Sequence, residues 1–160
     1  MALGLGRTVV RQEAPSGAFG ECRMMGPMPD TLLLSWDDLD RLVAVLAAEV
    51  GRNHDLVLAI TRGGLVPAGM LAYRLDLREI LVAGVEFYRS DGGTHARPRV
   101  LHFPDASLLA GKRVLVVDEV WESGETMTEV LARVRAAGGR AVSAVLHYKP
   151  ARSRVAARPD

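Results

Sequence analysis

The sequence is poor in cysteine, and it has no long hydrophobic run and no strong charge of one sign. Cys22 is the single cysteine in 160 residues, which excludes an internal disulfide and favours a reducing cytoplasm. The apolar runs are too short to span a bilayer, and residues 1–20 lack the apolar core of a secretory signal. The net charge is only +1 and the arginines are scattered, so we expect no nucleic-acid partner. The short apolar runs lead us to expect no membrane partner either.

Sustained periodicity is missing from the N-terminal part of the chain. Gly26, Pro27 and Pro29 interrupt any long element there, so we expect residues 1–30 to form an N-terminal tail or arm. The remainder, residues 31–160, is long enough for one domain with its own core.

Strand and helix patterns alternate along that domain. Ser35 and Asp38 form a capping-box pattern before a helix that ends near Gly51. Buried strands are predicted at 56–60, 80–87, 114–117 and 141–146, and helical patterns follow the first and third of them. This alternation predicts an α/β fold with a mostly parallel central sheet flanked by helices. Residues 88–104 form a long excursion, which we interpret as a hairpin or a functional loop.

The stretch from Val114 to Thr128 carries the strongest functional signal. An apolar strand is followed by the adjacent acids Asp118 and Glu119 and then by the small, polar turn Glu122–Thr126 at the start of a helix. Parallel sheets bind ligands at the carboxyl ends of their strands, and a helix start presents free N–H groups to anions. The pattern predicts a ligand with hydroxyls, a phosphate and a metal ion.

A second turn of similar design follows the strand at 56–60. Arg62, Gly63 and Gly64 combine a permanent cation with backbone that can approach an anion closely. If this were the one turn of its kind, we would interpret it as a tight turn with a surface arginine. Because the domain has a second such turn at Glu122–Thr126, we interpret the pair as a ligand site. Lys149 follows the last predicted strand, where position alone is equally compatible with a surface lysine.

The segments VLVVDEVWESGETM and LAITRGGLVPAGMLA together resemble the type I phosphoribosyltransferases. VEFYR and LHYKPARS are similar to the bacterial and archaeal branch that acts on the 6-oxopurines xanthine, guanine and hypoxanthine. The resemblance runs from about Leu34 to the C-terminus. It implies the type I phosphoribosyltransferase fold, a flexible lid formed by residues 88–104, and a non-proline cis peptide in the Arg62 turn.

The activity implied by the resemblance is transfer of the phosphoribosyl group from phosphoribosyl pyrophosphate (PRPP) to a purine base, giving a nucleoside monophosphate and pyrophosphate. Asp118 and Glu119 would bind the ribose hydroxyls and hold Mg²⁺ through water. Glu122 would accept or relay a proton of the purine. The residues implied for the 5′-phosphate are Ser123, Gly124, Glu125 and Thr126.

The same resemblance assigns the remaining roles. Arg62, Gly63 and Gly64 would hold the leaving pyrophosphate, which makes Arg62 a catalytic residue together with Glu122. Lys149 would face the exocyclic oxygen of the base. Relatives of this kind also imply a homo-oligomer.

Three departures from the family pattern motivate an alternative function. Glu122 stands where relatives carry aspartate, Glu125 adds a negative charge to the phosphate turn, and we expect the aromatic segment that covers the base in relatives to be missing after Lys149. The alternative is a regulatory protein that binds PRPP or a nucleotide without turnover.

Overall fold

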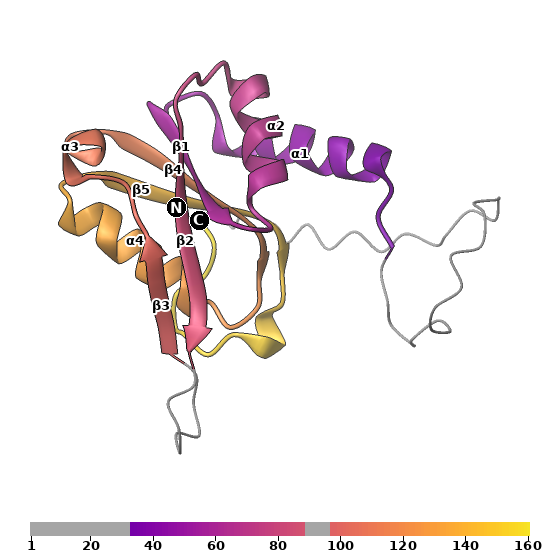
Figure 1. Cartoon of the computed structure of the whole chain (residues 1–160). Helices are drawn as coiled ribbons and strands as arrows, with labels where there is room; N and C mark the ends of the chain where they lie inside the picture. The colour runs from indigo at the N-terminus through magenta and orange to yellow at the C-terminus, as the bar shows by residue number, and fades with distance from the viewer. Residues whose placement is uncertain (1–32, 89–96) are drawn as a thin grey trace, which may run out of the picture. The chain divides into compact units, whose positions relative to one another are not determined.

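The computed structural model describes residues 33–88 and 97–160. Within these ranges five strands form one sheet in the order β3-β2-β1-β4-β5 (Figure 1). The strands are β1 (Leu56–Thr61), β2 (Ile80–Tyr88), β3 (Arg97–His102), β4 (Arg113–Trp121) and β5 (Arg140–Tyr148). Every neighbouring pair is parallel except β2 with β3, which confirms the prediction of a mostly parallel sheet.

Helices cover both faces of the sheet (Figure 1). On one face α1 (Trp36–Val50) and α2 (Leu65–Leu75) enclose a core with Val57 and Leu115. On the other face α3 (Ala106–Leu109) and α4 (Glu125–Ala136) pack on side chains of β1 and β4. The continuous apolar runs of β1 and β4 are therefore explained by burial on both sides. None of the helices in the described ranges is long and apolar enough to cross a bilayer.

The predicted start and end of α1 are confirmed by its caps. Ser35 Oγ accepts from the Asp38 N–H at 3.2 Å and Asp38 Oδ2 accepts from the Ser35 N–H at 3.0 Å, so the capping box that begins α1 is complete. Gly51 ends this helix with φ 67°. The helical pattern predicted after the strand at 114–117 forms α4, whose buried residues are Met127, Val130, Leu131 and Val134.

The central strand extends further than the sequence predicts. We expected it to stop at Val117, but β4 continues through both acids to Trp121. The pairing of β4 with β1 ends at Ala59↔Val117, whereas its pairing with β5 continues to Trp121↔Tyr148. The apolar run thus marks where the pairing of β4 with β1 ends, and Asp118 lies within β4.

The excursion at 88–104 is largely a hairpin. Strand β3 pairs antiparallel with β2, with a register shift between Gly84 and Val85. Residues 89–96 lie outside the described part of the chain, as do residues 1–32, so the lid and the N-terminal arm stay predictions.

Candidate active site

The turn between β1 and α2 lies directly against β4. The Thr61–Arg62 peptide bond is cis, as the resemblance implies. A Cβ at Gly64 would lie 2.5 Å from the Val117 carbonyl oxygen and 2.6 Å from that of Ile60, so only glycine fits between these backbones. A Cβ at Gly63 would overlap the Glu119 carboxylate. The basic turn and the acidic pair, far apart in sequence, are therefore in contact.

Asp118, the first residue of the acidic pair, lies in an environment that disfavours its charged form. Burial, reinforced by the neighbouring Glu119 carboxyl, raises the pKa of Asp118 to about 8. Asp118 Oδ1 accepts one hydrogen bond, from the Glu119 N–H at 2.9 Å. A partly buried acid without a balancing charge favours a cation or hydroxyl donors beside it.

The donor chemistry of this pair fits Mg²⁺. Asp118 and Glu119 supply hard carboxylate oxygens, and the described residues contain no cluster of three or more His, Cys, Asp or Glu side chains that would form an all-protein cage. Mg²⁺ is commonly held by one or two carboxylates together with water and substrate phosphates. The two carboxylates beside the turn at the start of α4 fit such a donor set.

The turn from β4 into α4 forms the floor of a hollow of about 240 Å³. Gly124 adopts φ 82°, a left-handed conformation that favours glycine, and Ser123 Oγ accepts from the Glu125 N–H at 3.3 Å. The first turn of α4 lines the hollow with Thr126 and Met127, and the N–H groups of a first helical turn have no carbonyl partner within the helix. The residues lining the hollow are Asp118, Glu119, Val120, Trp121, Glu122, Ser123, Gly124, Thr126 and Met127.

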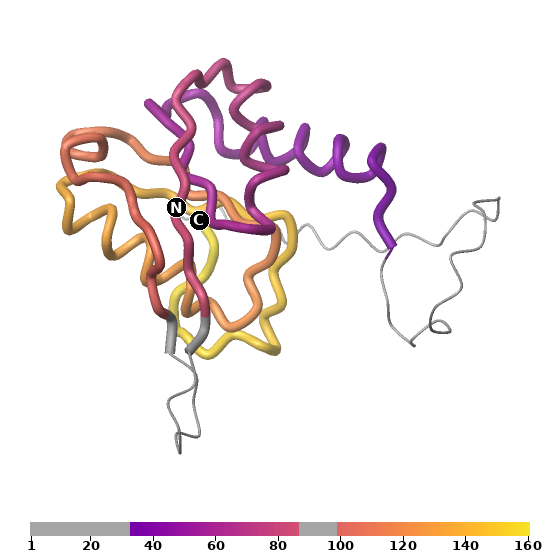
Figure 2. The backbone as a smooth tube through the Cα atoms, in the orientation of Figure 1, coloured from indigo at the N-terminus to yellow at the C-terminus, as the bar shows by residue number. Residues whose placement is uncertain are grey.

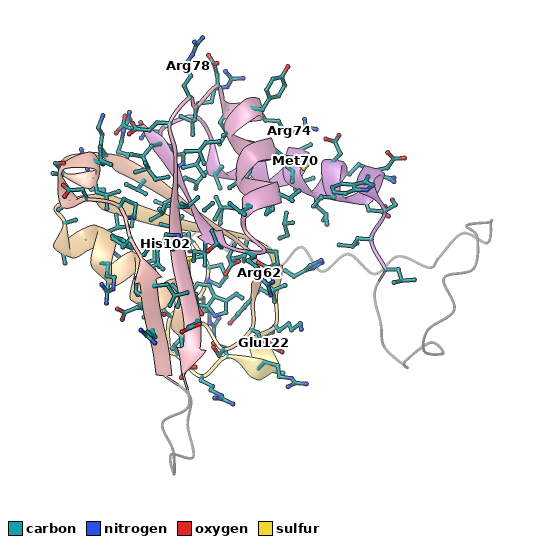
Figure 3. All side chains as sticks on the ribbon, in the orientation of Figure 1. Arg62, Met70, Arg74, Arg78, His102 and Glu122 are labelled. Carbon is teal, nitrogen blue, oxygen red and sulfur yellow. The ribbon has the colours of Figure 1, made fainter. Side chains whose placement is uncertain are left out.

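Lys149 reaches this site from β5. Its backbone N–H donates to the Trp121 carbonyl at 2.9 Å, and its Nζ lies 3.4 Å from Glu122 Oε1. Arg62 and Glu122 lie toward the same end of the sheet, away from Met70, Arg74 and Arg78 on the α2 side (Figure 3). Six of the predicted site residues line the hollow, namely Asp118, Glu119, Glu122, Ser123, Gly124 and Thr126, whereas Arg62, Gly63, Gly64, Glu125 and Lys149 are not among its lining residues.

Three residues that line the hollow were not predicted from the sequence. Val120 and Met127 line the hollow, and Trp121, which is 1% exposed, stands edge-on to Tyr148 with ring centroids 6.2 Å apart. The buried indole Nε1 of Trp121 has no hydrogen-bond partner among the described residues. Val120 and Trp121 would have been assigned to the strand had β4 been extended past Asp118, whereas Met127 lies in the first turn of α4.

Comparison with known proteins agrees with this arrangement. The family model described as the phosphoribosyl transferase domain matches residues 33–158. A xanthine-guanine phosphoribosyltransferase from Roseobacter denitrificans is 37% identical over 127 residues, which cover 73% of this chain and 70% of the relative.

Two solved structures share the fold. A purine phosphoribosyltransferase from Pyrococcus horikoshii matches with TM-score 0.66 and 32% identity over 79% of this chain and 81% of its own. A hypothetical protein from Neisseria gonorrhoeae with bound ppGpp matches with TM-score 0.72 and 30% identity over 84% of this chain and 80% of its own. With the sheet order, the acidic strand end and the two glycine turns, these similarities place the chain in the type I phosphoribosyltransferase family.

Proposed function

We propose that this protein transfers the phosphoribosyl group of PRPP to a 6-oxopurine base. The observation that carries the proposal is the contact between Gly63 and the Glu119 carboxylate, because it joins a cationic glycine turn to the acidic pair and the phosphate turn. One PRPP molecule carries the matching groups in the same order: pyrophosphate, ribose hydroxyls and 5′-phosphate. The relatives named as purine phosphoribosyltransferases support a purine acceptor.

PRPP binding follows from the chemistry of each turn. The N–H groups at the start of α4, with the hydroxyls of Ser123 and Thr126, hold the 5′-phosphate. Asp118 and Glu119 accept hydrogen bonds from the ribose 2′- and 3′-hydroxyls. Arg62 and the N–H groups of Gly63 and Gly64 hold the pyrophosphate.

Asp118 and Glu119 would hold Mg²⁺ through water. The ion would supply positive charge that neutralises the pyrophosphate. The acidic pair has a second effect, because negative charge beside the ribose stabilises positive charge on the sugar. Asp118, whose pKa is raised to about 8, supplies that charge only in its ionised form.

The reaction exchanges one bond at C1 of the ribose. The bond from C1 to the pyrophosphate oxygen breaks, and the electron pair leaves with pyrophosphate toward Arg62. A ring nitrogen of the purine forms the new bond to C1, and the proton of the purine passes to the Glu122 carboxylate. Lys149 donates to the exocyclic oxygen of the base and thereby favours a 6-oxopurine over adenine.

Competition between bases tests this assignment. The full chain is incubated with PRPP, Mg²⁺ and one base at a time, and nucleoside monophosphate formation is followed with xanthine, guanine, hypoxanthine and adenine. Turnover with at least one 6-oxopurine and little or none with adenine is expected. Turnover with adenine alone would contradict the role of Lys149.

The variant Asp118→Asn should weaken PRPP binding at least about tenfold, and Asp37→Asn, an exposed change on α1, should not.

A second candidate function is binding of guanosine tetraphosphate. The Neisseria gonorrhoeae structure holds ppGpp, and this nucleotide carries pyrophosphate groups that suit the Arg62–Gly64 and Ser123–Thr126 turns. Inhibition by ppGpp that is competitive with PRPP would support the candidate. Unchanged turnover at saturating ppGpp would exclude it.

We also propose that the protein forms a homo-oligomer and works in the cytoplasm. Apolar side chains lie exposed along α1 and α2, and Tyr73, at 90% exposed, is the clearest of them. A hollow between these helices has an apolar part, formed by Ala44, Ala48 and Met70 among others, and a charged rim of Asp40, Arg52 and Arg74. Sedimentation should show an oligomer that Tyr73→Glu dissociates. The single cysteine supports the cytoplasmic assignment.

A further inference from the structure

The C-terminal tail, defined here as Ser153–Asp160, returns to the back of the phosphate turn. The Arg154 N–H donates to the Ser123 carbonyl at 2.9 Å. Val155 is partly buried, and its Cγ2 lies 2.5 Å from where a Cβ on Gly124 would be. Figure 2 shows this last segment of the chain beside the turn between β4 and α4. The Ser123–Gly124 turn therefore lies between the hollow and the tail.

A second contact fixes the far end of the tail to β5. Asp160 Oδ2 accepts from both the N–H and the hydroxyl of Ser143 at 2.8 Å, and the Asp160 N–H donates to Ser143 Oγ at 3.0 Å. Ser143 is 1% exposed on the outer strand of the sheet. Loss of these bonds would leave buried polar groups of Ser143 unpaired, which is unfavourable. The tail is thus held at both ends, whereas the sequence predicted no element there.

We propose that the tail is a positioning element of the active site, in which Val155 and Asp160 hold the Ser123–Gly124 turn in its phosphate-binding conformation. The inference rests on the proposed function, because the phosphate concerned is the 5′-phosphate of PRPP. Neither residue lines the hollow, so each acts through the turn and not on the ligand.

The physical reason is preorganisation. Backbone N–H groups bind a phosphate well only if they already point toward one position, and the left-handed Gly124 gives the turn other accessible conformations. Val155 excludes those conformations by packing against Gly124 and the core around Trp121. Release of the tail should therefore weaken phosphate binding more than purine binding.

Two full-chain variants test the proposal at both ends of the tail, Val155→Ala and Asp160→Asn. Val45→Ala and Asp37→Asn make the same chemical changes on the exposed side of α1 and serve as controls. The first measurement is hydrogen exchange of the Ser123–Glu125 amides without ligand, where exchange in both tail variants should be about tenfold faster than in the wild type. The second is the Kd for ribose 5-phosphate, which should rise about tenfold.

The outcomes separate this inference from the proposed function. Wild-type exchange rates and a wild-type Kd in both tail variants would overturn the positioning role. A lower melting temperature with an unchanged Kd in the folded variants would also overturn it, because a tail that only stabilises the fold behaves in that way. If the wild type binds neither ribose 5-phosphate nor PRPP, the proposed function fails, while the exchange measurement still decides whether the tail holds the turn.

Discussion

Glu122 Oε1 lies 3.4 Å from Lys149 Nζ, so the two groups proposed to contact the purine face one another across the ends of β4 and β5. The pairing of these strands up to Trp121↔Tyr148 explains the proximity, since each residue directly follows its strand. Both side chains are 52% exposed, and an ion pair in such a position contributes little to stability. Both charged groups are therefore exposed to a base that binds beside them and displaces their mutual contact.

Glu122→Gln tests the acid of this pair. Glutamine keeps the size of the side chain but cannot take a proton, so kcat should fall by about 10²-fold or more while the KM for PRPP stays close to the wild-type value. Steady-state kinetics with saturating base provide the measurement. Glu49→Gln on the exposed side of α1 is the matched control. An unchanged kcat in Glu122→Gln would remove Glu122 from the proton-transfer step.

Lys149→Met tests the cation. Methionine has a similar length but no hydrogen-bond donor, so the preference for 6-oxopurines over adenine, measured as a ratio of kcat/KM values, should fall at least about tenfold. Lys112→Met, an exposed change in the turn before β4, should keep the preference. A preserved ratio in the Lys149 variant would show that another group reads the base.

Gly63→Ala tests the contact between the two turns. The added methyl group would overlap the Glu119 carboxylate, so PRPP binding should weaken by about tenfold or more as that carboxylate and the turn separate. Gly69→Ala is the matched control, because a Cβ at that position of α2 has nothing within 4 Å. Calorimetric titration with PRPP and Mg²⁺ compares the two variants. Equal PRPP affinity in both would contradict the proposed site.

Asp55→Asn tests a contact far from the site that stabilises the fold in a pH-dependent way. Hydrogen bonds from the Arg113 side chain and backbone hold the pKa of Asp55 well below its usual range. A depressed pKa in the folded state stabilises the protein at pH values above the unfolded pKa of about 3.9, and this stabilisation is lost as pH falls below it.

The free energy of unfolding in urea should therefore be lower for Asp55→Asn than for the wild type at pH 7, and the difference should shrink toward pH 3. Asp37→Asn, for comparison, should resemble the wild type at pH 7. A difference that is independent of pH would show that the Asp55 charge is not what stabilises the fold.

The sequence predicted those elements whose signals are local. The capping box at Ser35, the glycine end of α1 and the apolar stripe of α4 were correct because each depends on neighbouring residues. The acids and small residues at the end of β4 could also be recognised from the sequence, because they follow one another along the chain. The short helix α3 was not predicted, since four residues give no usable periodicity.

The sequence could not predict features that depend on contacts between distant segments. The true end of β4 is set by its pairing with β5, and the contact of Gly63 with Glu119 arises from the closeness of two separate turns. The tail showed no periodicity, because it is held by the Ser143 hydrogen bonds and by Val155 packing and not by secondary structure of its own.

Release of pyrophosphate is the measurement that tests the central claim most directly. The full chain is mixed with PRPP and Mg²⁺, with and without guanine, xanthine or hypoxanthine, and pyrophosphate and nucleoside monophosphate are both quantified. We predict that one of these bases gives equal amounts of the two products, and that Asp118→Asn gives far less of both. PRPP binding without pyrophosphate release for any of these bases would contradict the enzyme assignment and favour a regulatory role.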